Sequence, residues 1–298
     1  MVKYSQEILF NRCMTKLIAH LGPNGTYSEV ATLIYARQLQ EKTGSESKLV
    51  PFPNIAQTLK AVADGEADVG VVPVENSIEG VVAITLDTLW ELDTLQIQQG
   101  LNLPVVHNFL SRGKSLKGIK TVYSHPQALA QCQKWLDTNI PNAKLVAANS
   151  TTEALHFINH EPTAGAIASL RAAQLYDLPI KVANINDYPD NCTRFWVVSR
   201  EKHIGGNHLS LGFSFAKNKP GVLVKPLQIF ADKEINLTRI ESRPTKRSLG
   251  EYLFFFDLEG DSTKIEIQSA LEELSSLTKT LKIFGNYRVV TIKPEDLL

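Results

Sequence analysis

The order in which apolar runs and helical patterns follow one another constrains the fold of this chain more than any other feature. Between residues 17 and 200, apolar runs of strand length alternate with segments of helical period. This order predicts an α/β domain with largely parallel strands, because the chain must return before the next parallel strand can begin. The predicted strands are 16–20, 48–52, 69–74, 101–109, 120–123, 144–148, 164–168, 180–183 and 195–198, and the predicted helices are 27–40, 54–64, 127–138, 152–159 and 170–176.

A different rhythm begins near residue 205. Its predicted elements follow a strand, helix, strand, strand, helix, strand order at 209–215, 221–232, 237–242, 252–258, 264–278 and 280–288. That βαββαβ order is typical of a ferredoxin-like sandwich. The segment EKHIGGNH, with two adjacent glycines, has the composition of a linker. The sequence therefore predicts two domains, in agreement with a length of 298 residues.

Charge and cysteine content limit the classes of partner. The chain has 31 Lys and Arg against 31 Asp and Glu, so no net charge attracts nucleic acid or an acidic membrane, and no apolar run approaches a membrane span. Cys13, Cys132 and Cys192 form no CxxC pair, which favours a reducing, cytoplasmic compartment over a disulfide or zinc framework. Residues 1–16 are interpreted as an N-terminal extension rather than a targeting peptide.

Four segments place a capping side chain directly after a predicted strand. In each, the capping residue stands three positions before Glu or Gln, as at a helix start; the four are Thr26, Asn76, Ser124 and Ser150. Ligands of open α/β sheets bind beyond the carboxyl ends of strands, and helix N-termini offer free N–H groups to carboxylates or phosphates. Ordinary helix capping is the alternative reading. Because the four segments are also rich in further hydroxyls and amides, we predict a small anionic ligand in a cleft between two lobes.

Other candidate sites have weaker support. His156 and His160 have the spacing of two metal ligands, but no HExxH arrangement accompanies them, which favours a solvated helix face. Cys192 has no neighbouring histidine to activate it, which favours a buried thiol over a nucleophile. No metal ion and no organic cofactor is therefore expected.

Six segments of the chain together resemble motifs of the prephenate dehydratase family. The matching motifs are GPNGTYS at 22–28, PVENSIEG at 73–80, SHPQAL at 124–129, STTEA at 150–154, GAIAS at 165–169 and DNCTRF at 190–195. The resemblance implies a two-lobed catalytic domain of periplasmic-binding-protein type over 17–202, with one lobe formed by 17–100 and 182–202 and the other by 101–181. It also implies an ACT regulatory domain over 207–294, and the chain before residue 17 leaves no room for the chorismate mutase region of bifunctional members.

The resemblance implies a reaction in which prephenate loses carbon dioxide and water to give phenylpyruvate, without any cofactor. It gives Thr193 the role of hydrogen-bond donor to the departing hydroxyl, with His125 as the rival acid. Arg194 is expected to fork onto a substrate carboxylate, or alternatively to pair with Glu75 or Asp190. Phe195 is expected to pack beneath the site, on the same strand face as Thr193.

The other substrate-binding residues are expected in the four capping segments. They are Thr26, Tyr27, Ser28, Glu75, Asn76, Ser77, Ser124, Gln127, Ser150, Thr151 and Thr152. Among them, Glu75 is expected to orient its neighbours rather than touch a dianionic substrate.

The resemblance further implies feedback by phenylalanine, bound between the ACT domains of a homodimer or homotetramer. The expected effector residues are Gly221, Val222, Leu223, Val224, Asn236, Glu241, Ser242, Arg243 and Pro244, with the helix start near Gly221 as the carboxylate site. Val222 departs from the small alanine usual in the family. Two alternatives remain open, an arogenate dehydratase and a catalytically silent amino-acid sensor, and intact Thr193, Arg194 and Phe195 argue against the second.

Overall fold

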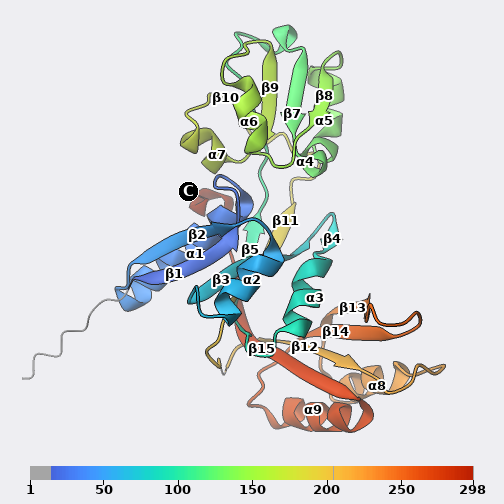
Figure 1. Ribbon diagram of the computed structural model, residues 1–298. Coiled ribbons are helices and arrows are strands. Elements are labelled where there is room, and N and C mark those ends of the chain that lie inside the picture. Colours follow the sequence, from blue (N-terminus) through green and yellow to red (C-terminus); the bar gives the residue numbers. More distant parts are fainter. Residues whose placement is uncertain (1–14, 204, 298) are drawn as a thin grey trace, which may run out of the picture.

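The fold has three parts, which Figure 1 shows one above another. It is described by a computed structural model over residues 15–203 and 205–297, so most of the predicted N-terminal extension lies outside the described residues. Lobe 1 lies in the middle, lobe 2 is joined to it by two crossing segments, and a C-terminal domain packs against the other side of lobe 1. The predicted two-lobed α/β domain and the βαββαβ domain after it are both confirmed.

Lobe 1 is built on four strands that run in one direction and a fifth strand that is antiparallel to them. β1 (Lys16–Leu21) pairs with β2 (Ser47–Phe52) and with β3 (Val69–Asn76). β11 (Cys192–Ser199) lies antiparallel between β3 and β5 (Gln96–Pro104). The helices are α1 (Tyr27–Thr43), α2 (Ile55–Ala63) and α3 (Ala83–Glu91), and a short β4 (Gly80–Val81) folds back onto β3. Their apolar faces pack on both sides of the sheet because the strand residues are apolar on both faces.

Lobe 2 has a five-stranded sheet in the order β10-β6-β9-β7-β8. Its strands are β6 (Asn108–Leu110), β7 (Thr121–Ser124), β8 (Lys144–Ala147), β9 (Ala164–Ala168) and β10 (Ile180–Val182). Short helices cover both faces: α4 (Pro126–Ala130), α5 (Gln133–Asn139), α6 (Glu153–Ile158) and α7 (Leu170–Leu175). The predicted strand 101–109 is wrong as one element, because the chain passes from lobe 1 to lobe 2 between β5 and β6. The predicted helix 127–138 is likewise two helices, with the break at Gln131 and Cys132.

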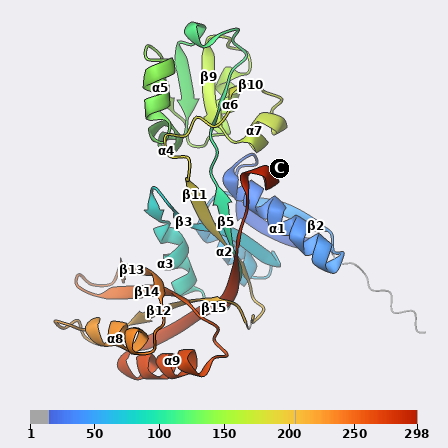
Figure 2. The same cartoon turned by 180° about the vertical axis from the view of Figure 1, so that it is seen from behind.

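The C-terminal domain continues the sheet of lobe 1. It consists of β12 (His208–Ser214), α8 (Val224–Asp232), β13 (Leu237–Pro244), β14 (Tyr252–Glu259), α9 (Ile265–Leu277) and β15 (Thr280–Thr291). β15 pairs with β12 and then, over Arg288–Thr291, runs parallel to β5. At Gly285 the two strands come so close that a Cβ would lie 2.5 Å from the Ile97 carbonyl oxygen. The C-terminal end then lies beside α1 (Figure 2).

Helix α3, absent from the sequence prediction, connects the C-terminal domain with the region between the lobes. Its Thr85 hydroxyl donates to the Pro73 carbonyl (2.6 Å), and Val82 stands directly before its first residue. Farther along, the Asp87 carboxylate accepts two hydrogen bonds from Arg243 of β13 (3.1 Å each). Trp90 meets Phe255 edge to face. One helix thus contacts both the C-terminal domain and the strand end of lobe 1 (Figure 1).

The buried boundary between the domains also contains a charge pair. Arg239 of β13 approaches Asp257 of β14 to 2.9 Å (Nη2 to Oδ2), without the alignment of a hydrogen bond. The guanidinium carbon of Arg239 lies 5.0 Å from the ring centre of Trp196 in β11, and the Trp196 indole donates to the Tyr287 hydroxyl at 3.1 Å. Strand β13 of the C-terminal domain therefore contacts β11, the strand that contains Thr193, Arg194 and Phe195.

Candidate active site

A cavity of about 290 Å³ lies between the two lobes. Its lining combines apolar residues with neutral polar ones: Leu21, Gly22, Thr26, Tyr27, Ser28, Pro73, Asn76, Val82, Val105, His107, His125, Gln127, Ala128, Gln131, Asn149, Ser150, Thr151, Thr193 and Phe195. None of these described lining residues is Lys, Arg, Asp or Glu. An anion in this cavity would therefore be held by hydrogen-bond donors and peptide dipoles rather than by a formal positive charge.

The Thr193 hydroxyl is oriented by Asn76. The Asn76 Oδ1 atom accepts from the backbone N–H groups of Ile78 (3.1 Å) and Glu79 (3.0 Å), which can only donate. The Asn76 Nδ2 group must therefore face the other way, where it donates to Thr193 Oγ1 at 2.9 Å. Since the hydroxyl accepts from Asn76, its own hydrogen is free to be donated to a group in the cavity.

Two of the predicted capping residues, Thr26 and Ser150, cap as expected and line the cavity. Thr26 caps α1 by accepting from the Glu29 N–H (3.4 Å), which leaves the first turn at Tyr27 and Ser28 along the wall. On the lobe 2 side, Ser150 accepts from the Glu153 N–H at 2.9 Å, before α6. Burial raises the pKa of the Tyr27 phenol, whose hydroxyl donates to the Val106 carbonyl (2.6 Å).

The other two segments differ from the prediction in different ways: no helix follows Asn76, whereas α4 does begin at Pro126 as predicted, but with another residue as its cap. No helix begins after Asn76, which instead turns the chain from β3 into β4. Ser124 is not the cap of α4, since its buried hydroxyl donates to the Ile167 carbonyl (2.7 Å). His125 takes the capping position, and its Nδ1 atom accepts from the Gln127 N–H at 3.3 Å.

Several predicted site residues do not line the cavity. Arg194 bonds to Asn102 through Nε (3.1 Å) and pairs with Glu75, with 3.8 Å between Nη1 and Oε2, so the alternative ion pair is the contact that the structure shows. Ser77 accepts from the Cys192 N–H (3.0 Å). Thr152 is 1% exposed and lies behind Ser150, at 3.1 Å between the hydroxyl oxygens.

The family comparison agrees with this site. The profile described as "Prephenate dehydratase" matches residues 18–203, which is more than half of the chain, and the profile "ACT domain" matches residues 210–276. The chain belongs to the prephenate dehydratase family. It is thus a hydro-lyase of phenylalanine biosynthesis with an ACT domain.

Relatives and solved structures support the assignment across most of the chain. A bifunctional chorismate mutase/prephenate dehydratase of Aquifex aeolicus is 40% identical over 91% of this chain and 73% of its own length. The prephenate dehydratase of Methanocaldococcus jannaschii is 36% identical over 93% and 99%. Among solved structures, the prephenate dehydratase of Arthrobacter aurescens in complex with L-Phe has a TM-score of 0.81, 31% identity and 94% coverage of both chains. GqqA, called a quorum quenching acylase, has a TM-score of 0.79, 30% identity and coverage of 92% and 98%.

Sequence reasoning missed three polar residues of this prephenate dehydratase cavity: His107, Gln131 and Asn149. Burial lowers the pKa of His107, whose Nε2 atom lies 3.0 Å from Gln131 Oε1. His107 stood inside an apparently continuous strand and Gln131 inside an apparently continuous helix. Pro104, which ends β5 three residues before His107, was a signal for the first break, whereas the break at Gln131 has no Gly or Pro beside it.

Neither described cysteine is an activated thiol. Burial raises the pKa of Cys192, and it raises that of Cys132 to about 12. No described group of three His, Cys, Asp or Glu side chains is placed to hold a metal ion, and no described helix has the length and apolarity to cross a membrane.

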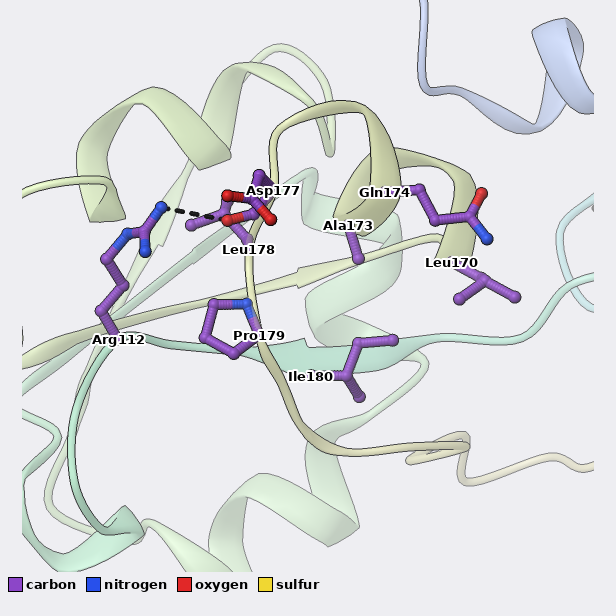
Figure 3. A pocket seen from close by; sticks show the side chains of 8 residues that line it. All are labelled: Arg112, Leu170, Ala173, Gln174, Asp177, Leu178, Pro179 and Ile180. Carbon is purple, nitrogen blue, oxygen red and sulfur yellow. Dashed lines mark hydrogen bonds between the residues drawn. The ribbon is translucent and has the colours of Figure 1, made fainter.

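A second hollow, of about 530 Å³, lies on lobe 2 beside α7 (Figure 3). It is lined by Arg112, Leu170, Ala173, Gln174, Asp177, Leu178, Pro179 and Ile180. Its one cation, Arg112, donates to the Asp177 carbonyl (3.0 Å) and to Asn159, so its guanidinium is already engaged. The interlobe cavity, where the family motifs converge, is the better candidate for the active site.

Proposed function

We propose that the interlobe cavity binds prephenate through neutral donors and that Thr193 donates a hydrogen bond to the departing hydroxyl. The observation that carries this proposal is the fixed direction of the Asn76–Thr193 hydrogen bond, which leaves the Thr193 hydrogen available. Donation to a poor leaving group is the help that this dehydration needs, since the aromatic ring formed by the reaction supplies much of the driving force.

The two substrate carboxylates are assigned to hydrogen-bond donors on both walls. On lobe 1, the first turn of α1 at Tyr27 and Ser28 offers backbone N–H groups and the positive end of a 17-residue helix. On lobe 2, Gln127, Asn149 and Thr151 line the wall with amide and hydroxyl donors. Closure of the two walls around the ring would exclude water and place both carboxylates at once.

His125 fits the role of proton donor less well than Thr193. Its Nδ1 lone pair accepts the Gln127 N–H, so protonation at Nδ1 would remove a helix cap. Arg194 is assigned a supporting role, in which its contacts with Asn102 and Glu75 hold the start of β11. Glu75 keeps the orienting role expected of it and does not line the cavity.

An acylase reaction has less support from the geometry. Acyl transfer needs a nucleophile activated by a base. Thr193 Oγ1 instead accepts from the Asn76 amide, which makes the oxygen a poorer nucleophile and its hydrogen a better donor. The described thiols have raised pKa values, as noted above.

Regulation by L-phenylalanine at the ACT domain is the second part of the proposal. Gly221, Val222 and Leu223 form the turn before α8, and Val224 begins that helix. β13, which contains Glu241, Ser242 and Pro244, is an edge strand whose Ile240 is 52% exposed, so it is accessible to a second subunit. Asn236 bonds to Glu259. We assign the effector to this turn and strand at a contact between two copies of the chain, in a cytoplasmic homodimer or homotetramer.

The substrate assignment is tested by assaying the purified protein with prephenate and with arogenate, with and without L-phenylalanine. Turnover of prephenate to phenylpyruvate, reduced by L-phenylalanine, is expected. Turnover of arogenate alone would identify an arogenate dehydratase, and no turnover of either would favour a sensor. The subunit state is measured in the same samples.

The role of Thr193 is tested separately with Thr193→Val and Thr193→Ser. Valine keeps the shape without the hydroxyl, so kcat is expected to fall about 10²- to 10³-fold with little change in KM. Serine retains a hydroxyl and is expected to retain most of kcat. Equal turnover by the valine variant and the parent would remove Thr193 from the mechanism.

A further inference from the structure

We propose that Asn191 is a positioning residue that, together with the N–H groups of Ile78 and Glu79, holds the direction in which the Thr193 hydroxyl donates, acting through Asn76. Asn191 is 2% exposed and does not line the cavity. It stands immediately before β11, where its carbonyl accepts from the Val105 N–H (2.8 Å) and joins the two segments that cross between the lobes. This inference rests on the proposed role of Thr193.

The Asn191 side chain occupies the middle of a chain of amides whose direction is fixed at both ends. Its Oδ1 atom accepts from Asn76 Nδ2 at 2.9 Å, and its Nδ2 group donates to Gln131 Oε1 at 2.8 Å. Gln131 Nε2 in turn faces the Glu79 carboxylate at 3.4 Å, which accepts. The chain therefore begins at the Glu79 N–H, passes through three amides and ends at the Glu79 carboxylate.

Because this chain of hydrogen bonds begins and ends at Glu79, it forms a closed ring. Only one direction of donation around that ring gives every donor an acceptor. Turning the Asn76 amide over would set its oxygen against Asn191 Oδ1 and its Nδ2 against two backbone N–H groups. Turning the Gln131 amide over would set its oxygen against the Glu79 carboxylate. Each amide thus opposes reversal of the others, and the result at the cavity is that Thr193 accepts from Asn76 and donates elsewhere.

The ring also joins the two lobes at their hinge. Asn76 belongs to lobe 1 and Gln131 to lobe 2, and Asn191 bonds to both from the crossing segment. A change in lobe separation would move Gln131 from Asn191 and weaken the constraint on Asn76. The donor direction of Thr193 is therefore linked to lobe closure by a residue that does not contact substrate.

A double-variant cycle tests this role. Asn191→Ala is expected to lower kcat about 10- to 100-fold, with KM within about threefold of the parent, because buried amides lose their partners. In the Thr193→Val background the same substitution is expected to have almost no further effect on kcat, because it acts through the missing hydroxyl. A purely structural residue would lower kcat by the same factor in both backgrounds.

Two further variants keep the test decisive. Asn191→Asp has the same shape, so it serves if the alanine variant does not fold. Its carboxylate cannot donate to Gln131. We expect it to lower kcat in the protein that retains Thr193 and to have almost no further effect in the Thr193→Val background. Asn108→Ala is the matched control, because Asn108 is a buried hinge amide that bonds only to backbone atoms. Any loss of kcat in Asn108→Ala is expected to be equal in both backgrounds.

The outcomes separate this inference from the proposed function. If Thr193→Val alone leaves kcat unchanged, the role of Thr193 is wrong. Suppose instead that Thr193→Val lowers kcat, but the Asn191 substitutions leave kcat unchanged or lower it by the same factor in both backgrounds. Thr193 then keeps its role, and the positioning role of Asn191 is overturned.

Discussion

The cavity and the boundary between the domains both place polar side chains among apolar ones, but the polar groups differ in kind. The cavity lining consists of neutral donors and apolar groups, whereas the boundary has charge pairs: Arg243 with Asp87 across it, and Arg239 with Asp257 on its C-terminal side. The two regions share β11, with Thr193 in the cavity and Trp196 beneath the C-terminal domain. This difference in charge between the two regions agrees with the proposed reaction, in which the charge of the bound substrate changes. A substrate carboxylate that leaves as carbon dioxide loses its charge, so a strong ion pair would stabilise the ground state more than the transition state. At a fixed boundary no such penalty applies.

The largest effect is expected at the boundary. Asp257→Asn should lower the free energy of unfolding by about 3–5 kcal/mol, because it leaves the Arg239 guanidinium buried without a counter-charge. Urea denaturation measures this loss. The control is Asp93→Asn, which removes the exposed partner of Lys282 and should cost less than about 1 kcal/mol. Equal costs for the two variants would contradict a special role of the buried pair.

A charge placed in the cavity wall should cost activity as well as stability. Asn76→Asp keeps the two acceptor contacts with the N–H groups of Ile78 and Glu79 but removes the donor to Thr193. The Thr193 hydroxyl would then donate to the introduced carboxylate and no longer to the substrate. We expect kcat to fall about 10²- to 10³-fold, or about 2.7–4 kcal/mol. The free energy of unfolding should fall as well, by about 1–3 kcal/mol, because the introduced oxygen faces the Asn191 Oδ1 acceptor in a buried network. Unchanged kcat would show that the direction of this hydrogen bond does not matter.

An intermediate effect is expected where α3 joins the two regions. Burial opposes ionisation of Asp87, but hydrogen bonds from Arg243 and Lys246 lower its pKa below the ordinary value, so the contact is ionic. Asp87→Asn should leave turnover in the absence of L-phenylalanine nearly unchanged. It should reduce the response to L-phenylalanine by about 5- to 150-fold, the usual range of about 1–3 kcal/mol for allosteric coupling. Inhibition curves measure this.

The same experiment has an internal control in the C-terminal domain. Lys233 and Glu273 form an ion pair that does not reach lobe 1, with 2.7 Å between Nζ and Oε1. Glu273→Gln should leave the phenylalanine response intact. If both variants lose the response equally, the effect reflects the C-terminal domain in general and not the contact with α3.

The smallest effect is a pH dependence of stability that originates in the cavity wall. Burial lowers the pKa of His107, so the folded protein keeps this imidazole neutral where the unfolded chain takes up a proton. Stability is therefore complete above an unfolded pKa near 6.5 and is lost as pH falls below it, by at most about 1.4 kcal/mol per pH unit. His107→Gln should flatten the slope of unfolding free energy against pH. Parallel slopes for the two proteins would contradict this contribution.

The sequence predicted the order of elements and the polar residues at strand ends because both depend on local patterns. It placed Thr193 and Phe195 correctly on one face of a strand, but the same alternation sends Arg194 to the other face, where the structure shows its pair with Glu75. Helix α3 was missed because its N-terminus has no side-chain cap. Contacts such as Arg243 with Asp87 join residues 156 positions apart, and no local pattern encodes them.

The pairing of β15 with β5 has a practical consequence for protein engineering. A fragment that stops at the linker near residue 205 would leave one side of β5 without hydrogen-bond partners, and such uncovered strand edges promote aggregation. A separately expressed first domain should therefore carry a substitute for Arg288–Thr291, for example this segment fused through a linker so that it can pair with β5.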